Sequence, residues 1–159
     1  ECQVREKLGK GFERSAKALR RLINVVPECL ALRAIDGISA MHDLTEGGVM
    51  GGVWELAEAA SLGVEFDLSD VPVMEETKRL CKALGLDPYR LISSGSIIFT
   101  VHPDKAEGAE TALKGIGTPS SRIGQMTLPG ERRKYRDLHG RWRPLSPPSP
   151  DELWKGVHH

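Results

Sequence analysis

The chain has 159 residues, a length that fits a single domain. Lys and Arg together number 22, as do Asp and Glu, so no excess of charge attracts nucleic acid or an anionic membrane. Hydrophobic residues make up 40% of the chain, no apolar run is long enough to cross a bilayer, and no signal-peptide pattern begins it. The odd number of cysteines fits no zinc spacing and indicates reduced thiols, so we expect a cytoplasmic globular protein without membrane contact.

The N-terminal part of the chain predicts two helices that follow a polar lead-in over residues 1–11. Apolar residues then recur at helical spacing up to Pro27, which predicts one amphipathic helix. These apolar positions are Phe12, Ala16, Leu19 and Ile23. A second, shorter helix is expected over residues 28–35.

The rest of the chain predicts strands that alternate with helices. Strands are expected over residues 38–41, 64–68, 96–101 and 121–128, with helices over 48–61, 74–84 and 104–114. The strand over 96–101 is apolar enough to be central in a sheet. Two further short strands, around Tyr135 and Trp142, are expected to pair across the turn at 137–140. The proline-rich tail is expected to run over the surface and to form a turn of helix at 151–154. This order predicts an α+β fold, a layered domain with a mixed sheet packed by helices.

The stretch "HDLTEGGVMGG", from His42 to Gly52, combines an acid, a hydroxyl and four glycines just before a helix. Unpaired N–H groups and a partial positive charge make such a turn a suitable phosphate site. A structural interpretation stays open, in which Asp43 or Thr45 caps the helix and Gly51 and Gly52 allow the helix to pack tightly against the sheet. Each glycine inside a helix costs about 1 kcal/mol relative to alanine, so a cap alone does not explain four of them.

A second candidate turn is "SSGSIIFTV", where Ser93, Ser94 and Gly95 lead directly into a buried strand. Such a turn at the edge of a sheet can face a cleft. The alternative is a plain loop.

In this order and spacing, the two segments resemble the C-terminal domain of the AIR synthase superfamily. The likeness extends over residues 12–126, includes "LGLDPYRLISSG", and is greatest to the HypE hydrogenase expression/formation proteins and to AIR-synthase-related proteins. The resemblance implies an ATP-dependent, magnesium-dependent enzyme whose active site lies between two domains. The N-terminal domain, which carries most ATP and Mg²⁺ ligands and builds a homodimer, is then expected elsewhere in the same polypeptide.

The resemblance also implies roles for individual residues. Asp43 corresponds to the motif's acid, a catalytic residue and a possible Mg²⁺ ligand. Five further residues correspond to positions that bind phosphate or substrate: Thr45, Gly47, Gly48, Ser94 and Gly95. The chain then supplies the substrate and phosphate side of the cleft for a small-molecule or protein substrate, and is expected to be inactive alone.

Two departures from the family limit what the resemblance implies. Ser93-Ser94 stands where many relatives carry Asn-Glu, which removes a carboxylate. HypE proteins end in a cysteine that accepts a carbamoyl group, whereas the last cysteine here is Cys81. The expected AIR-synthase-like domain covers residues 12–145. Residues 146–159 are interpreted as a tail whose terminal His pair is the remnant of a purification tag.

The basic segment "ERRKYRDLHGRWRPL" motivates an alternative function. The chain would then be a non-catalytic interaction module that binds a protein or nucleic-acid partner through this hairpin. The structural interpretation is an edge hairpin whose charges deter aggregation, which makes a nucleic-acid partner unlikely. His42 adjoins the glycine turn and is interpreted either as a general base or as a packed residue at the end of a strand.

Overall fold

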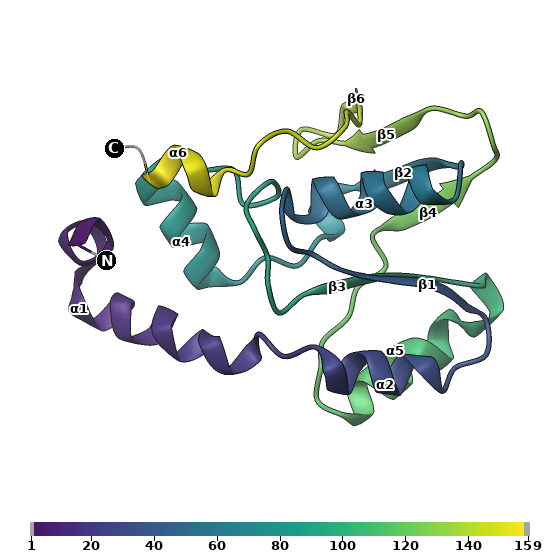
Figure 1. The fold of residues 1–159 in the computed structure, drawn as a ribbon, viewed down its shortest axis with the longest axis horizontal. Coiled ribbons are helices and arrows are strands. Elements are labelled where there is room, and N and C mark those ends of the chain that lie inside the picture. Colours follow the sequence, from purple (N-terminus) through teal and green to yellow (C-terminus); the bar gives the residue numbers. More distant parts are fainter. Residues whose placement is uncertain (1, 158–159) are drawn as a thin grey trace.

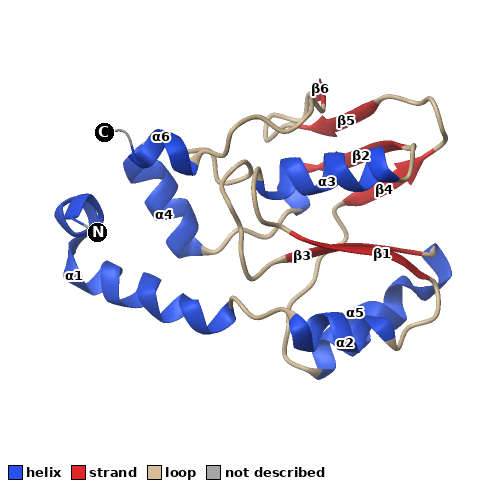
Figure 2. Cartoon of the chain, in the orientation of Figure 1, coloured by secondary structure: helices blue, strands red, loops and turns tan. Residues whose placement is uncertain are grey.

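The computed structural model describes residues 2–157, and the terminal His pair lies outside them. The helices of this part are α1 Cys2–Ala18, α2 Val26–Arg33, α3 Gly48–Ala59, α4 Glu75–Leu84, α5 Ala106–Gly115 and α6 Leu153–Val157. The strands are β1 Ile38–Asp43, β2 Gly63–Asp67, β3 Ile97–Val101, β4 Gly124–Thr127, β5 Arg133–Arg136 and β6 Trp142–Pro144. Short 3₁₀ turns cover Leu19–Leu22, Leu68–Asp70 and Pro103–Lys105. Figure 1 shows these elements in chain order, and Figure 2 separates helices from strands.

The strands form two sheets. β1 and β3 pair antiparallel as a two-stranded ribbon. The other sheet has the order β4-β2-β5-β6, in which β2 is antiparallel to β4 and parallel to β5. The predicted α+β fold with a mixed sheet is therefore confirmed. The position of β3 differs from the expectation of a central strand, because within residues 2–157 it pairs with β1 alone and all five of its residues are half-buried.

Helix α3 lies between the two sheets, as Figure 1 shows, and packs against β1, β2 and β3. Apolar side chains of α3 and β2 form the main core, together with Leu145 near the C-terminus. A second core lies on the other face of the ribbon, where α2 and α5 bury Leu32, Ala109 and Leu113. The structure is thus layered, with α2 and α5, then the ribbon, then α3, then the four-stranded sheet.

The first helix differs from the prediction at both ends. It begins at Cys2 and includes most of the expected lead-in, with a kink where Gly9 takes φ 83° and ψ 164°. It packs on α4, where Arg79 stacks on the buried ring of Phe12. Beyond the contact with α4, little covers this part of the chain. Ile23, one of the apolar positions of the predicted helix, is therefore 51% exposed rather than buried. Pro27 lies in the first turn of the next helix rather than between the two helices, as its fixed φ allows.

The C-terminal segment also differs from the expectation of a surface tail. Leu145 is buried in the main core, and Asp151 and Glu152 are only 5% and 6% exposed. The short helix lies at Leu153–Val157 rather than at 151–154. In Figure 1 the segment runs from β6 past the start of α3 and ends beside α4.

Candidate functional site at the glycine turn

The structure brings the two predicted segments together at one end of the β1–β3 ribbon. The backbone N–H of Leu44 donates to the Ser96 carbonyl at 3.0 Å, and the N–H of Ser93 donates to the Leu44 carbonyl at 2.9 Å. Asp43 lies opposite Ile97 in the register. The Asp43, Thr45 and Ser94 positions are all exposed at this edge. The two predicted turns therefore lie together at one edge, where Gly47 and Gly48 are themselves buried.

The N-cap residue of the helix after the glycine turn is neither of the two residues predicted for that role. The N-cap is Gly47, in the left-handed region at φ 74°, and it makes no side-chain cap hydrogen bond. Asp43 is the last residue of β1, and the Thr45 N–H donates to the Asp43 carbonyl at 3.1 Å. The hypothesis that Asp43 or Thr45 caps the helix through its side chain is therefore wrong.

A close approach of two backbone segments explains why position 48 is a glycine. Its φ is +57°, and a Cβ at this position would lie 2.5 Å from the Leu91 carbonyl oxygen and 2.8 Å from that of Tyr89. Both atoms belong to backbone that cannot move independently, so only glycine fits without displacing it. Gly95 is held in the same way, because a Cβ there would overlap the Leu22 carbonyl. The packing interpretation, which concerned Gly51 and Gly52, is confirmed at Gly52, where a Cβ would overlap the Leu44 side chain and lie 3.7 Å from Cγ2 of Ile98.

Protein acceptors already engage several N–H groups at the start of α3. The Met50 N–H donates to the Tyr89 carbonyl at 3.1 Å, and the Gly48 N–H donates to the Thr45 carbonyl at 3.4 Å. The Gly47 N–H donates to the Asp151 carboxylate, Oδ2, at 2.8 Å. Of these acceptors only Asp151 is a charged side chain, and it comes from 104 residues away in the sequence. Asp151 is thus a functional candidate that the sequence reasoning missed.

The signal that could have found Asp151 is weak. The acidic pair Asp151-Glu152 stands between a proline-rich stretch and "LWK", which is typical of the start of a short helix. Its carboxylate does receive the Leu153 N–H at 2.8 Å, as in such a start. Nothing in the pattern indicates its second partner, since that contact depends on the tertiary fold.

Asp43 and His42 form the charged part of the site. The Asp43 side chain is 59% exposed, and the His42 Nδ1 lies 3.6 Å from its Oδ1. On its other side, the His42 Nε2 lies 2.6 Å from Glu55 Oε2 on α3. His42 is thus a hydrogen-bonded residue at the end of a strand, set between two carboxylates. This arrangement favours the packed interpretation over a free general base.

A magnesium ion would find one ligand at this edge. Among residues 2–157, no group of three or more His, Cys, Asp and Glu side chains is arranged to hold a metal. Mg²⁺ commonly keeps several waters and binds one or two carboxylates together with substrate phosphates. The exposed carboxylate of Asp43 fits such a shared role, whereas a complete metal site would need ligands from outside this surface.

Cys81 does not form a nucleophilic site. Cys81 is buried on α4, and burial raises the pKa of its thiol, with a further increase from Asp87 and Glu152. A raised pKa keeps the thiol protonated, and the thiolate is the nucleophile. Cys81 is therefore a packing residue, as the sequence indicated for reduced thiols.

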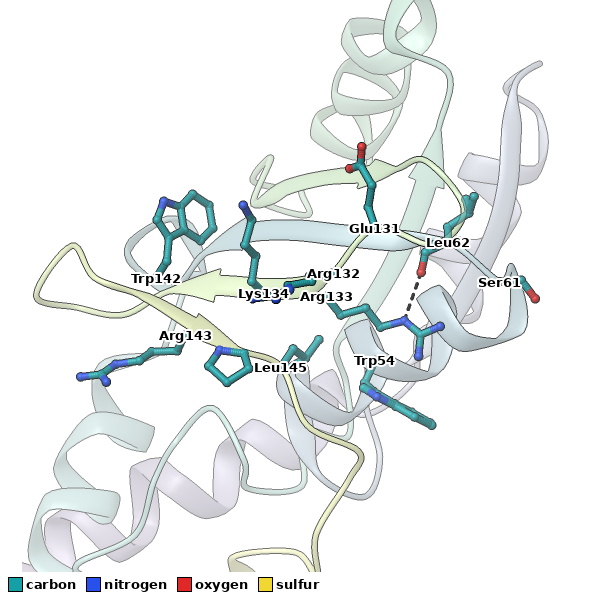
Figure 3. A pocket seen from close by; sticks show the side chains of 12 residues that line it. Trp54, Ser61, Leu62, Glu131, Arg132, Arg133, Lys134, Trp142, Arg143 and Leu145 are labelled. Atoms are coloured by element: carbon teal, nitrogen blue, oxygen red, sulfur yellow. Dashed lines mark hydrogen bonds between the residues drawn. The ribbon is translucent and has the colours of Figure 1, made fainter.

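The basic hairpin lies at the other end of α3, beside a hollow of about 570 Å³. Figure 3 shows Trp54 and Trp142 on opposite sides of the hollow, with Arg133 and Lys134 between them. None of the residues that line it belongs to the glycine turn or to the 93–96 turn. The hollow is therefore a different surface from the predicted site.

Most cations of the hairpin have carboxylate partners close by. The ion pairs on this surface are Arg133–Glu58, Lys134–Glu65, Arg136–Asp67, Arg141–Asp137 and Arg143–Asp137. Lys134 and Arg136 also lie over the ring of Trp142. Paired cations attract a polyanion less than free ones do, because each new contact must replace an existing one. These pairs favour the interpretation of the segment as a structural hairpin.

The fold and the joined turns define the class of protein, a layered α+β domain with a glycine turn at the edge of a two-stranded ribbon. The family "AIR synthase related protein, C-terminal domain" matches residues 3–134, and the chain belongs to this family. Carbamoyl dehydratase HypE of Escherichia coli is 32% identical over 133 residues, which are 81% of this chain and 39% of the relative. The matched region thus spans about two fifths of that relative's length.

Solved structures agree with the family assignment. The crystal structure of E. coli HypE, a hydrogenase maturation protein, superposes with a TM-score of 0.71 at 30% identity and covers 83% of this chain and 42% of that one. A structure of HypE in complex with ATP superposes with a TM-score of 0.63 at 28% identity and covers 69% and 36% of the two chains. In residues 2–157, no helix has the length and apolar character needed to span a membrane.

Proposed function

We propose that this chain forms the substrate and phosphate side of an interdomain cleft in an ATP-dependent enzyme related to HypE. The observation that carries the proposal is the joining of the two motif segments through Leu44, which hydrogen-bonds to both Ser93 and Ser96. Two loops that hydrogen-bond to each other keep a fixed relative geometry, as a binding wall requires. The HypE structure with ATP supports nucleotide use in the family.

In this proposal the polar groups of the edge and of the glycine turn have separate roles. The Asp43 carboxylate contributes one oxygen ligand to a Mg²⁺ that is shared with phosphate oxygens. The hydroxyls of Thr45 and Ser94 donate hydrogen bonds to phosphate or substrate oxygens, and backbone N–H groups at Gly47 and Gly48 add the partial positive charge of the helix start. ATP, when bound, supplies the phosphoryl group, and the residues of this chain position and stabilise charge.

The proposal includes partners that lie outside this chain. An N-terminal domain in the same polypeptide supplies the opposite wall, most ATP ligands and the dimer contacts, so the chain alone is inactive. The edge described here is open, with Asp43, Thr45 and Ser94 exposed on it. An open polar edge of this kind fits a cleft that is completed by another domain. Such a cleft excludes water only when its two walls meet. The substrate is then a small molecule or a protein group that enters between them.

The test uses the polypeptide that joins this chain to its ATP-binding domain. Asp43→Ala should reduce ATP hydrolysis roughly 10- to 100-fold, because it removes a proposed ligand of the metal. A matched control is Asp104→Ala, since the Asp104 side chain is 83% exposed and lies on the Pro103–Lys105 turn. The control should keep the activity of the unchanged protein. Full activity of Asp43→Ala would remove Asp43 from the mechanism.

A further inference from the structure

The C-terminal strap, defined here as residues 146–157, is attached to the glycine turn by buried carboxylates. Asp151 and Glu152 are 5% and 6% exposed, although carboxylates are seldom buried unless they are paired. Both Asp151 oxygens are engaged, Oδ2 by the Gly47 N–H and Oδ1 by the Leu153 N–H, each at 2.8 Å. The carboxylate is therefore held in one orientation, with one oxygen directed at the start of α3.

The strap also covers the turn sterically. A side-chain carbon at Gly47 would lie 3.7 Å from the Cβ of Pro148, and one at Gly51 would lie 3.9 Å from the same atom. Pro148 is thus in van der Waals range of both glycine positions on the outer side of the turn. A ligand that approached the Gly47 N–H would meet the Asp151 carboxylate and the Pro148 ring.

A second anchor holds the strap at a different place. Glu152 Oε2 accepts the Asp87 N–H at 3.3 Å, and the Glu152 N–H donates to the Arg90 carbonyl at 3.4 Å. Neither contact involves the glycine turn. Lys155 forms an ion pair with the other oxygen of Glu152. The strap is therefore attached at two points, of which only Asp151 engages the N–H group that a phosphate would use.

We infer that the strap is autoinhibitory, because Asp151 and a phosphate oxygen of the ligand cannot both accept the Gly47 N–H. This inference rests on the proposed function of the glycine turn as a phosphate site. A tethered carboxylate acts at a high effective concentration, so it excludes a weak anion until the strap lifts. Release of the Glu152 anchor then opens the site without any change in the turn itself.

The test measures anion binding by the 159-residue chain through the amide NMR signals of Gly47 and Gly48. Inorganic pyrophosphate is the probe, titrated at constant ionic strength. Asp151→Asn removes the competing charge, and Glu152→Gln weakens the second anchor only. Each should bind pyrophosphate about tenfold more tightly than the unchanged chain, as expected for the loss of one charge-assisted hydrogen bond. The matched control is Glu46→Gln, which removes an exposed charge beside Gly47 outside the strap.

Glu46→Gln should change the affinity by less than about twofold, because salt screens an exposed charge. Three results would overturn the strap while leaving the phosphate site in place. These are equal affinity in all variants, a gain in Asp151→Asn without one in Glu152→Gln, and a gain in Glu46→Gln as large as in Asp151→Asn. If pyrophosphate moves neither glycine signal in any folded variant, the proposed phosphate site and the strap inference both fail.

Discussion

The two ends of α3 contain the features that most resemble binding sites, and they are built in different ways. At the N-terminal end, Gly48 fits against backbone carbonyls and the polar groups are N–H donors with protein acceptors. At the C-terminal end, Arg133 stacks on Trp54 and pairs with Glu58. One end depends on the absence of side-chain volume, and the other depends on the presence of side-chain charge.

This difference separates a site from a scaffold. Most cations of the hairpin are paired with carboxylates of α3, of β2 or of the hairpin itself, so a ligand there would have to break existing pairs. At the glycine end, the Gly47 N–H is bound by a carboxylate from a separate segment, which can be displaced without rebuilding the turn. Substitutions that add volume should therefore damage the first end most, and substitutions that remove charge should damage the second.

The largest effect is expected from Gly48→Ala. The added methyl would overlap the carbonyl oxygens of Leu91 and Tyr89, and alanine is strained at φ +57°. Overpacking and left-handed strain together should lower the free energy of unfolding by roughly 3 kcal/mol or more. Urea denaturation followed by circular dichroism measures the change.

Gly85→Ala separates strain from overlap in that experiment. Gly85 also has positive φ, at +70°, but no atom lies within 4 Å of a Cβ built there. Its substitution should lower the free energy of unfolding by only about 1 kcal/mol. If both variants lose the same stability, the close contact at Gly48 contributes nothing and the glycine end is not limited by volume.

A smaller effect is expected at the other end of α3 from Arg133→Met, which keeps the apolar stem. Arg133 donates to the carbonyls of Leu62 and Ala57 at 3.1 and 3.4 Å and lies over Trp54, so its guanidinium satisfies the end of the helix. The variant should lower the free energy of unfolding by about 1–2 kcal/mol in urea denaturation.

The neighbouring Arg132→Met is the matched control, because Arg132 is exposed. An exposed substitution of this kind should change the unfolding free energy by no more than about 0.5 kcal/mol. Equal losses at the two positions would mean that the contacts of Arg133 with the end of α3 do not stabilise it.

Local patterns in the sequence were sufficient to predict most elements of the fold. The strand expected over 64–68 overlaps β2, and the helices expected over 104–114 and 74–84 are α5, which buries Ala106, Ala109 and Leu113, and α4, which Gly85 ends in the left-handed conformation. The hairpin across 137–140 was also predicted correctly. These features depend on periodicity and turn chemistry within a few residues, which the sequence displays directly.

The features that could not be predicted depend on contacts between distant segments. β3 looked central because it is apolar, but its apolar side chains are covered by helices on both faces, with Ile97, Phe99 and Val101 against the α2–α5 core and Ile98 against the main core. The burial of Asp151 depends on the position of Gly47, and no local pattern links an acid to a donor 104 residues away. At the candidate site, the family resemblance implied that both turns belong to one cleft, whereas no feature of the sequence indicated the strap.

The smallest effect, and the sharpest contrast between the two ends, is expected from pH. The backbone N–H of Arg141, followed by the Arg143 guanidinium and the His139 N–H, holds the pKa of Asp137 well below its ordinary value, against the opposing effect of burial. A lowered pKa in the folded state means that the carboxylate stabilises the hairpin fully above its ordinary pKa of 3.8 and less as the pH falls below that value.

The difference in urea midpoint between the unchanged chain and Asp137→Asn should therefore be constant from about pH 7 to 5 and narrow below about pH 4. The difference for Gly48→Ala should not change over the same range, because steric overlap carries no charge. A difference for Asp137→Asn that stays constant on acidification would show that charge does not hold the hairpin, and the contrast between the two ends of α3 would then be one of packing alone.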